Sequence, residues 1–483
     1  MLASPLGMPT HAELVDLARQ QARLIEVLET QNQALAARII ELEARLKGNS
    51  KNSSRPPSSD GLAKPRAKSL RKKTGRRPGG QKGHPGSTKL QVDNPDEVVT
   101  HRPVACDGCG QEFDEHDQVA KVQHRQVFEL PEIQARVVQH DLCEMVCSCG
   151  VKTLAPAPAG VVAPVQYGPR LRAAVLYLYQ AQFCSKARTA KACSDLFGVP
   201  ISSGSVANFQ QMADRQLDRF IELVKSQARQ AGVLGGDETG VRVAGRTAWL
   251  HVARHGLATV LEVHSRRGAA AMEDIGVLPG YAGVLVHDAL AGYDKIAPGA
   301  THQLCGAHLV RELAAVSEFL ASHPEYAQPD GWDWAGQVAW GLQQIKRGCD
   351  QAVDGVCPPG VLGPMRHLIV SAGLVAAHSE CQPPGVLGAK HRALARRVAG
   401  RGDDYLRFAT DRAVPFDNNG SERDLRMAKL RMKVSGCFRA DTGAQWFARL
   451  RSYLSTTGKN GLGPHAALLR IFNYDAWLPA PTT

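Results

Sequence analysis

The sequence lacks any run of 18 or more apolar residues, so it predicts no transmembrane helix. Its beginning, MLASPLGMPTHAELVDLARQQ, lacks a charged segment followed by an apolar one, so we expect no secretory signal. Cysteine is too scarce for a disulfide scaffold, with 12 in 483 residues, and five of the 12 fall within residues 106–149. These absences favour a cytoplasmic protein whose clustered cysteines hold a metal under reducing conditions.

Acidic residues are scarce in one part of the chain. The whole sequence carries 58 Lys and Arg against 46 Asp and Glu, and between Arg55 and Lys89 eleven basic residues face a single acid, Asp60. The excess suggests nucleic acid rather than a membrane surface as the partner, and hence association with the nucleoid. Residues 48–95, rich in Pro, Gly and Ser, are expected to form a flexible arm that follows DNA phosphates. The alternative is a solvated linker. The candidate contacts are Arg71, Lys72, Lys73, Arg76 and Arg77.

Residues 11–47 have the pattern of one long helix with an apolar seam. Mostly apolar residues recur every seven positions, and a second set lies four positions further along. The two sets are Leu14, Gln21, Leu28, Leu35 and Leu42, and Ala18, Ile25, Asn32, Ile39 and Leu46. This d/a pattern favours a parallel coiled-coil dimer in which paired Asn32 side chains fix the register. A single amphipathic helix packed on its own domain is the alternative.

Residues 96–160 contain two groups of cysteines about 40 residues apart, which is typical of a structural zinc module. The predicted ligands are Cys106, Cys109, Cys147 and Cys149, with Cys143 as a substitute in the second pair. Buried thiols without a metal are the alternative. The stretch between the two groups, VFELPEIQARVVQH, alternates as strands do.

Residues 165–229 are expected to be helical. A first helix should end near Phe197, because Gly198 and Pro200 break the chain there. Ser203, or a neighbouring Ser, should cap a second helix that runs through Met212. This helix-turn-helix rhythm is consistent with DNA binding and equally with ordinary helix packing.

The hydrophobic pattern changes from that of helices to that of strands after residue 230. VLGGDETGVRV, TAWLHVAR and ATVLEVHSR predict three strands, GAAAMEDIGVL a helix and GVLVHDAL a fourth strand. Three strands, a helix and a strand is the order of a ribonuclease H-like α/β core, here residues 230–302. We interpret residues 303–411 as a helical insertion, 412–440 as a capped core helix and 441–483 as a helical tail. The predicted fold is therefore multidomain α+β.

Three carboxylates are candidates for a metal site in this core. Asp is depleted in strands, yet Asp237 lies in the middle of the first strand. Asp288 ends the fourth strand, which neighbours the first in this order, and Glu422 lies in the first turn of the late helix. Such a cluster needs a compensating cation, and Mg²⁺ or Mn²⁺ prefers oxygen ligands. Two such ions could catalyse phosphoryl transfer. The alternative is that these acids are ordinary turn or cap residues, and Glu238 faces the opposite side of the strand.

In this order along the chain, nine segments resemble those of the DDE transposases of bacterial insertion sequences, the insertion-sequence-66 family. They are the N-terminal zipper, KNSSRPPSSD, GRRPGGQKGHPG, the cysteine region, GGDETGVRV, VHDALAGYDKI, CGAHLVREL, PFDNNGSERDLRMAKLRMKVSG and NGLGPHAALL. The resemblance implies that Asp237, Asp288 and Glu422 are the catalytic residues. It also places Cys305, His308 and Arg311 near the active site, without a chemical role. The chain departs from the family in its C-x-C pair and in Gly420 and Ser421, where members usually have larger or acidic residues.

The resemblance implies an enzyme that binds the inverted repeats of its element, cleaves there and joins the 3′-hydroxyls to target DNA. Arg423, Arg426 and Lys429 follow Glu422 at helical spacing, as contacts to DNA phosphates or as a solvated basic face. Expected partners are DNA, a second copy of the chain, as a dimer or a higher assembly on DNA, and accessory proteins such as those often encoded beside family members. The expected cofactors are two Mg²⁺ or Mn²⁺ ions and a structural Zn²⁺. A nuclease without strand transfer and a silent DNA-binding regulator are the alternatives.

Overall fold

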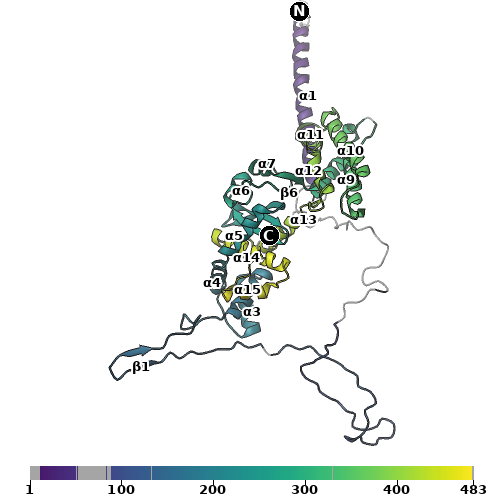
Figure 1. Cartoon of the computed structure of the whole chain (residues 1–483). Coiled ribbons are helices and arrows are strands. Elements are labelled where there is room, and N and C mark those ends of the chain that lie inside the picture. The colour runs from purple at the N-terminus through teal and green to yellow at the C-terminus, as the bar shows by residue number, and fades with distance from the viewer. Residues whose placement is uncertain are drawn as a thin grey trace, which may run out of the picture. The chain divides into compact units, whose positions relative to one another are not determined.

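A computed structural model describes residues 11–49, 52, 83, 89–131, 133–328 and 330–480 (Figure 1). Most of the predicted basic arm, including Arg71, Lys72, Lys73, Arg76 and Arg77, lies outside the described residues. The chain divides into two compact units, one formed by residues 65–139 with 196–198 and the other by the rest. The predicted cysteine module is therefore shared between the two units.

The strand prediction for VFELPEIQARVVQH is wrong. The described residues 127–131 and 133–140 have no regular secondary structure. Val137 is 90% and Leu130 is 75% exposed, and these residues lie on opposite faces of an extended chain, so neither face is buried there. Alternation predicts a strand only where one face is buried, and that condition is not met here. A short hairpin follows instead, formed by β1 (Glu144–Val146) and β2 (Lys152–Leu154).

Residues His11–Lys47 form one helix, α1, as the heptad pattern predicts. None of its residues is fully buried. Near its C-terminal end the helix packs against α11 (Gly385–Gly400), with Ala37, Ile40 and Ala44 half-buried. Those residues lie on a different side of the helix from the predicted seam, whose large apolar side chains are all exposed.

The region after the hairpin is helical, as predicted. It contains α2 (Pro169–Leu176), which ends in a π-helical turn at Tyr177–Ala181, then α3 (Lys186–Phe197), α4 (Ser203–Asp214) and α5 (Asp218–Gln230). Gly198 follows α3 with φ of 65°, a conformation that favours glycine. The hydroxyl of Ser202 accepts a hydrogen bond from the Ser205 amide and so caps α4.

A five-stranded mixed sheet follows, in the spatial order β5-β4-β3-β6-β7. Its strands are β3 (Val233–Val243), β4 (Arg246–His255), β5 (Ala258–His264), β6 (Val284–His287) and β7 (Thr301–Leu304). The first three strands are antiparallel, whereas β6 pairs in parallel with β3, and β7 with β6. The first and fourth strands are therefore neighbours, as predicted. The short strand β7 was not anticipated and crosses the boundary that we set at residue 303.

Different helices cover the two faces of the sheet. On one face, Val241 of β3 and Leu250 of β4 pack against α13 (Asn419–Ser435) and α14 (Asp441–Lys459). On the other face, Leu234 and Leu285 pack against α5, α6 (Ala269–Ile275) and α7 (Ala291–Ile296). Since strand residues alternate between faces, Asp237 belongs to the α13 face and Glu238 to the α7 face.

The insertion is helical, as predicted. Between β7 and α13 lie α8 (Gly306–Ser322), the 3₁₀ turn Pro324–Tyr326, α9 (Trp334–Gln351), α10 (Pro359–His378), α11, α12 (Gly402–Leu406) and the 3₁₀ turn Arg407–Ala409. By length and composition alone α10 could cross a membrane, but its Ile369 and Ala372 are buried in a core shared with α9 and α11. The helix is thus accounted for as part of the insertion. The tail ends in α15 (Pro464–Phe472).

Candidate active site

Two consecutive glycines explain how β3 presents Asp237. A Cβ at Gly235 would lie 2.7 Å from Oγ of Ser421 in α13, and a Cβ at Gly236 would lie 2.8 Å from the ring of Tyr293 in α7. The strand is therefore approached closely from both faces just before the carboxylate. Neither position accommodates a side chain without displacing a neighbour, which accounts for GG before Asp237.

The parallel pairing of β3 with β6 brings Asp288 level with Asp237. Val233 pairs with Val284 and Gly235 with Val286. Continuing this register by two residues sets Asp288 opposite Asp237, on adjacent strands that are about 4.8 Å apart. Asp288 is half-buried, and its Oδ1 accepts a hydrogen bond from the Leu290 amide (3.1 Å). The two carboxylates thus lie side by side where β6 ends, on the two neighbouring chain segments.

Glu422 reaches this place from the first turn of α13. The start of the helix is held by Asn418, whose side-chain amide donates to the carbonyl of Gly236 (2.8 Å) and whose backbone amide donates to Sγ of Cys305 (3.3 Å). The side chain of Asn418 makes no capping hydrogen bond to α13. The predicted helix is present with Asn418 at its N-cap position, and this residue ties the helix to β3.

The CGAHLVREL segment surrounds Glu422, as the family resemblance implied. Nη2 of Arg311 donates to Oε1 of Glu422 (3.4 Å), and Nδ1 of His308 lies 3.8 Å from the same oxygen. Cys305 is buried, and burial raises the pKa of its thiol to about 11. The thiol is therefore neutral at pH 7, and its sulfur accepts from the backbone amide of Asn418.

The charges of Asp288 and Glu422 act on Asp237. The pKa of Asp237 is raised to about 8, first by burial and then by the negative charges of Asp288, Glu238 and Glu422. Three segments far apart in the sequence therefore converge on one spot. A carboxyl with such a pKa is largely protonated at neutral pH unless a cation compensates the cluster.

Glu238 has a different environment on the opposite face. Its Oε1 accepts from Nε of Arg267 (2.7 Å), and its Oε2 accepts from the hydroxyl of Tyr293 (2.8 Å). Burial raises its pKa, as does the charge of Asp288, while Arg267 and Tyr293 lower it. With both oxygens occupied by protein donors, Glu238 has a supporting role.

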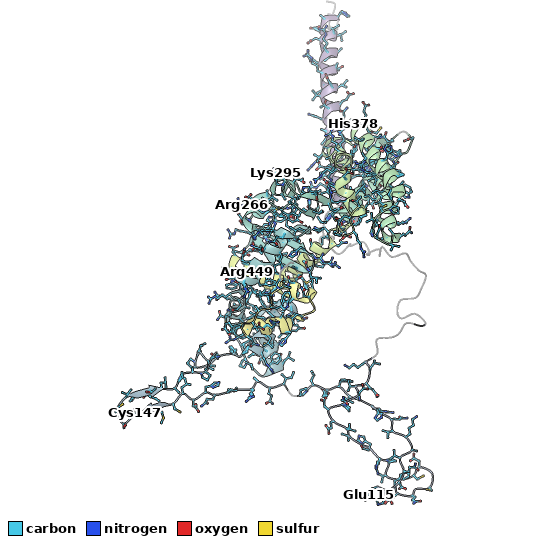
Figure 2. All side chains as sticks on the ribbon, viewed as in Figure 1. Glu115, Cys147, Arg266, Lys295, His378 and Arg449 are labelled. Atoms are coloured by element: carbon cyan, nitrogen blue, oxygen red, sulfur yellow. The ribbon has the colours of Figure 1, made fainter. Side chains whose placement is uncertain are left out.

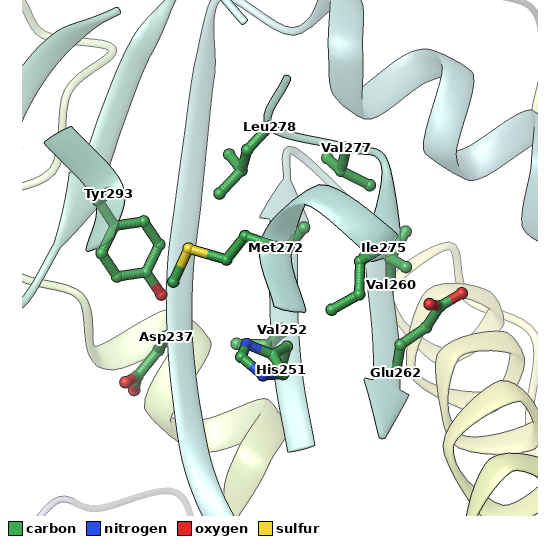
Figure 3. A pocket seen from close by; sticks show the side chains of 11 residues that line it. Asp237, His251, Val252, Val260, Glu262, Met272, Ile275, Val277, Leu278 and Tyr293 are labelled. Carbon is green, nitrogen blue, oxygen red and sulfur yellow. The ribbon is translucent and has the colours of Figure 1, made fainter. Parts of the chain in front are cut away.

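A small cavity lies behind Asp237, between the sheet and α6 (Figure 3). It encloses about 30 Å³, which is room for one or two water molecules. Val252, Val260, Met272 and Leu278 line it, and the carboxylate of Asp237 points away from them. This cavity is too small for a substrate.

Sequence reasoning missed a cluster beside Asp288. His287, Asp294 and His302 place potential ligand atoms within 4.8 Å of one another, a grouping that could hold a metal ion. Burial lowers the pKa of His287 to about 3 and also lowers that of His302, so both rings are neutral. His287 was visible in VLVHDAL, but its partner His302 lies on the unanticipated strand β7.

The cysteines occur in two similar turns, one in each compact unit. The amides of Gly108 and Cys109 face Cys106 and lower the pKa of its thiol, and the amide of Cys149 does so for Cys147. Positive φ angles at Gly110 (73°) and Gly150 (85°) close the turns. Cys147 lies at the tip of the β1–β2 hairpin (Figure 2). Turns with amides directed at a sulfur suit a bound thiolate, and the four-cysteine zinc site, with Cys143 exposed nearby in sequence, stays a prediction.

The basic residues that follow Glu422 differ in accessibility. Arg423 and Arg426 are exposed, whereas Lys429 is half-buried and donates from its ammonium to the carbonyl of Gly240 (3.1 Å). Burial lowers the pKa of Lys429. The two arginines are therefore better placed than Lys429 to meet a polyanion.

Comparisons with known proteins add one decisive match. A sequence model described as Transposase IS66 family matches residues 164–446, more than half of the chain. A second, described as a family of unknown function (DUF6444), matches residues 8–90. No curated protein matches the chain significantly. The first match contains the sheet, the insertion and all three carboxylates.

Proposed function

Because the chain belongs to the Transposase IS66 family, we propose that it is a DDE-type DNA transposase with a ribonuclease H-like core. Its catalytic residues are Asp237, Asp288 and Glu422. The observation that carries the proposal is their convergence, seen in the raised pKa of Asp237 and in the parallel pairing of β3 with β6. A core built for packing alone would not gather three acids there, because their mutual repulsion is destabilising.

The donor set fits divalent Mg²⁺ or Mn²⁺. Carboxylate oxygens are the ligands that these hard cations prefer, and the charges of Asp288, Glu238 and Glu422 raise the pKa of Asp237. Arg311 and His308 approach Glu422, but neither appears among the groups that lower the pKa of Asp237. Two bound ions would supply activation of an attacking oxygen and stabilisation of a leaving one.

The proposed reaction has two displacements at phosphorus. In the first, water attacks the phosphodiester at the element's end, an O–P bond forms as the bond to the 3′-oxygen breaks, and a 3′-hydroxyl is released. In the second, that hydroxyl attacks a target phosphodiester and displaces the adjoining 3′-oxygen. The role of the chain is to hold both DNA segments at one site, since positioning provides much of such catalysis.

DNA binding is assigned to several segments outside the core. The arm of residues 48–95, the cysteine module and the helices α3 and α4 are the proposed contacts to the terminal repeats. Arg423 and Arg426 project from the helix that carries Glu422, so they are suited to bind phosphates near the scissile bond. Accessory proteins encoded by the element are further candidate partners.

The test is incubation of the protein with labelled element ends, Mg²⁺ and target DNA. Cleavage at the end and joined product together are expected. Pre-nicked ends separate the candidates, because a plain nuclease would leave them unjoined. Binding of the ends without cleavage would favour the regulator instead.

The proposed dimer depends on the seam of α1. Leu28, Leu35 and Ile39 are 48%, 61% and 56% exposed, although the other side of the helix packs against α11. Charging the seam with Leu28→Lys and Leu35→Lys is expected to convert the dimer to a monomer, measured by analytical ultracentrifugation. Val27→Lys is the matched control, since Val27 is equally exposed (52%) but lies off the seam. A Leu28→Lys/Leu35→Lys variant that sediments like the parent would contradict the predicted coiled-coil dimer.

The proposed zinc site gives a second prediction. The purified protein should contain about one zinc per chain, and Cys106→Ser or Cys147→Ser should lose it, because each removes one of four thiolates. Elemental analysis measures the metal. Cys437→Ser, which changes an exposed cysteine outside the module, is the control. Zinc that persists in both variants would rule out these ligands.

A further inference from the structure

A chain of polar side-chain contacts leads to the backbone beside Asp288. The amide of Ala289 donates to Nδ1 of His287 (3.2 Å). The proton of this neutral imidazole is therefore on Nε2, which donates to Nδ1 of His302 (3.0 Å). The Nε2–H of His302 then faces Oδ1 of Asp294, 3.6 Å away. Each donor fixes the tautomer of the next ring, so the chain has one direction.

The far end of this chain is anchored in the helical insertion. Arg401, between α11 and α12, holds Asp294 with two hydrogen bonds of 3.1 and 3.0 Å. Nε of the same arginine donates to Asp404 (2.7 Å). Arg407 donates to the backbone carbonyl of His302 (2.9 Å). Two insertion arginines thus fix the last two members of the chain.

The near end lies at a strained residue. Ala289 has φ of 70°, the left-handed conformation that is strained for a residue with a Cβ. Its amide is held by His287, while the next amide, that of Leu290, donates to Asp288. The conformation of Ala289 therefore sets where the Asp288 carboxylate points. Strain of this kind persists where surrounding contacts enforce it.

We propose that His287, His302, Asp294 and Arg401 are positioning residues through which the helical insertion fixes the metal-binding orientation of Asp288. The inference rests on the proposed function, in which Asp288 binds a metal ion. It gives the insertion a role in the chemistry although it contributes none of the three carboxylates. Contacts that DNA makes with α11 or α12 would reach the active site by this route.

The side chains of His287, His302 and Asp294 could instead bind a metal ion of their own. The contacts favour the positioning role over a metal site, because both oxygens of Asp294 accept hydrogen bonds from Arg401. Nδ1 of His287 is also engaged, by the Ala289 amide, which leaves only Nε2 for a metal. A metal here would have to displace the existing partners of Asp294.

Mn²⁺ binding to the full-length protein, measured by calorimetry, tests the proposal. Arg401→Met, Asp294→Asn and His302→Phe are each expected to weaken Mn²⁺ binding about tenfold without changing binding of element ends. Arg366→Met is the matched control, because Arg366 makes a similar two-bond pair with Asp403 in the insertion but has no link to Asp288. The double variant Arg401→Met/His302→Phe should bind no more weakly than His302→Phe, since both break one chain.

A second variant tests the route through the backbone. Ala289→Gly removes the strain, so in the His302→Phe background it should restore part of the lost Mn²⁺ affinity. No recovery, additive losses in the double variant, or parental affinity in all three single variants would overturn the proposal. So would a Zn²⁺ site that His302→Phe abolishes. Asp288→Asn distinguishes a failure of this proposal from a failure of the proposed function. Parental Mn²⁺ binding in that variant would refute the proposed function itself.

Discussion

Replacing Asp288 with Asn is expected to abolish both cleavage of element ends and strand joining. The amide keeps the size of the side chain but removes the negative charge that would hold a metal ion beside Asp237. We expect a loss of at least about 1,000-fold in rate, equivalent to roughly 4 kcal/mol of transition-state stabilisation. Product formation from labelled ends in Mg²⁺ measures it, and binding of the ends should stay unchanged.

The control is a carboxylate of the same kind outside the site. Asp350 is exposed on α9 and pairs with Lys346, so Asp350→Asn should cleave and join like the parent. Cleavage by Asp288→Asn at the parental rate would remove Asp288 from the catalytic set. Loss of end binding in that variant would instead point to a folding defect, which thermal unfolding would reveal.

Replacing Asp237 with Asn is expected to stabilise the metal-free protein. The unfolded carboxyl loses its proton near its ordinary pKa of about 3.9, whereas the folded one keeps it up to about pH 8. Between these values the folded state binds more protons, so its stability falls as pH rises and levels off above 8. Asp237→Asn removes this loss and should raise the Tm in EDTA by about 2–4 °C at pH 8.

The neighbouring acid should respond in the same direction but less strongly. Burial also raises the pKa of Glu238, so Glu238→Gln removes a carboxylate that costs stability at pH 8, while the loss of its pair with Arg267 offsets part of the gain in Tm. Mg²⁺ should raise the Tm of the parent, and Asp237→Asn should abolish most of that rise, because the ion binds the folded state alone. Differential scanning fluorimetry from pH 5 to 9 measures both effects. Equal Tm values for the parent and Asp237→Asn at pH 8 would contradict the assigned environment.

Periodicity predicted much of the architecture. β3 begins at Val233 and ends at Val243 as expected, since its apolar residues face cores on both sides of the sheet. The α13 helix and the position of Glu422 in its first turn also agree. The convergence of the three carboxylates followed from strand order and family resemblance together, because spacing alone allows an acid to be a cap.

Other features depend on tertiary contacts that the sequence does not display. The four residues of β7 are too short for a pattern, and only pairing with β6 defines them. Asn418 has the sequence context of a cap, yet its side-chain oxygen accepts from no amide of α13, and its side-chain NH2 group donates to the carbonyl of Gly236. The chain of contacts beside Asp288 forms only because residues 287, 294, 302 and 401 come together in the fold. No local sequence pattern predicts that these residues meet.

At the two glycines before Asp237, only the backbone of β3 separates the helices on the two faces of the sheet. Ser421 touches it from one side and Tyr293 from the other, with no side chain between them. Tyr293 also holds Glu238, and the Ser421 turn carries Glu422 next in sequence. We therefore expect a displacement of α7 at Tyr293 to shift β3 at Gly236 and, one residue earlier in the strand, its contact with α13 at Ser421.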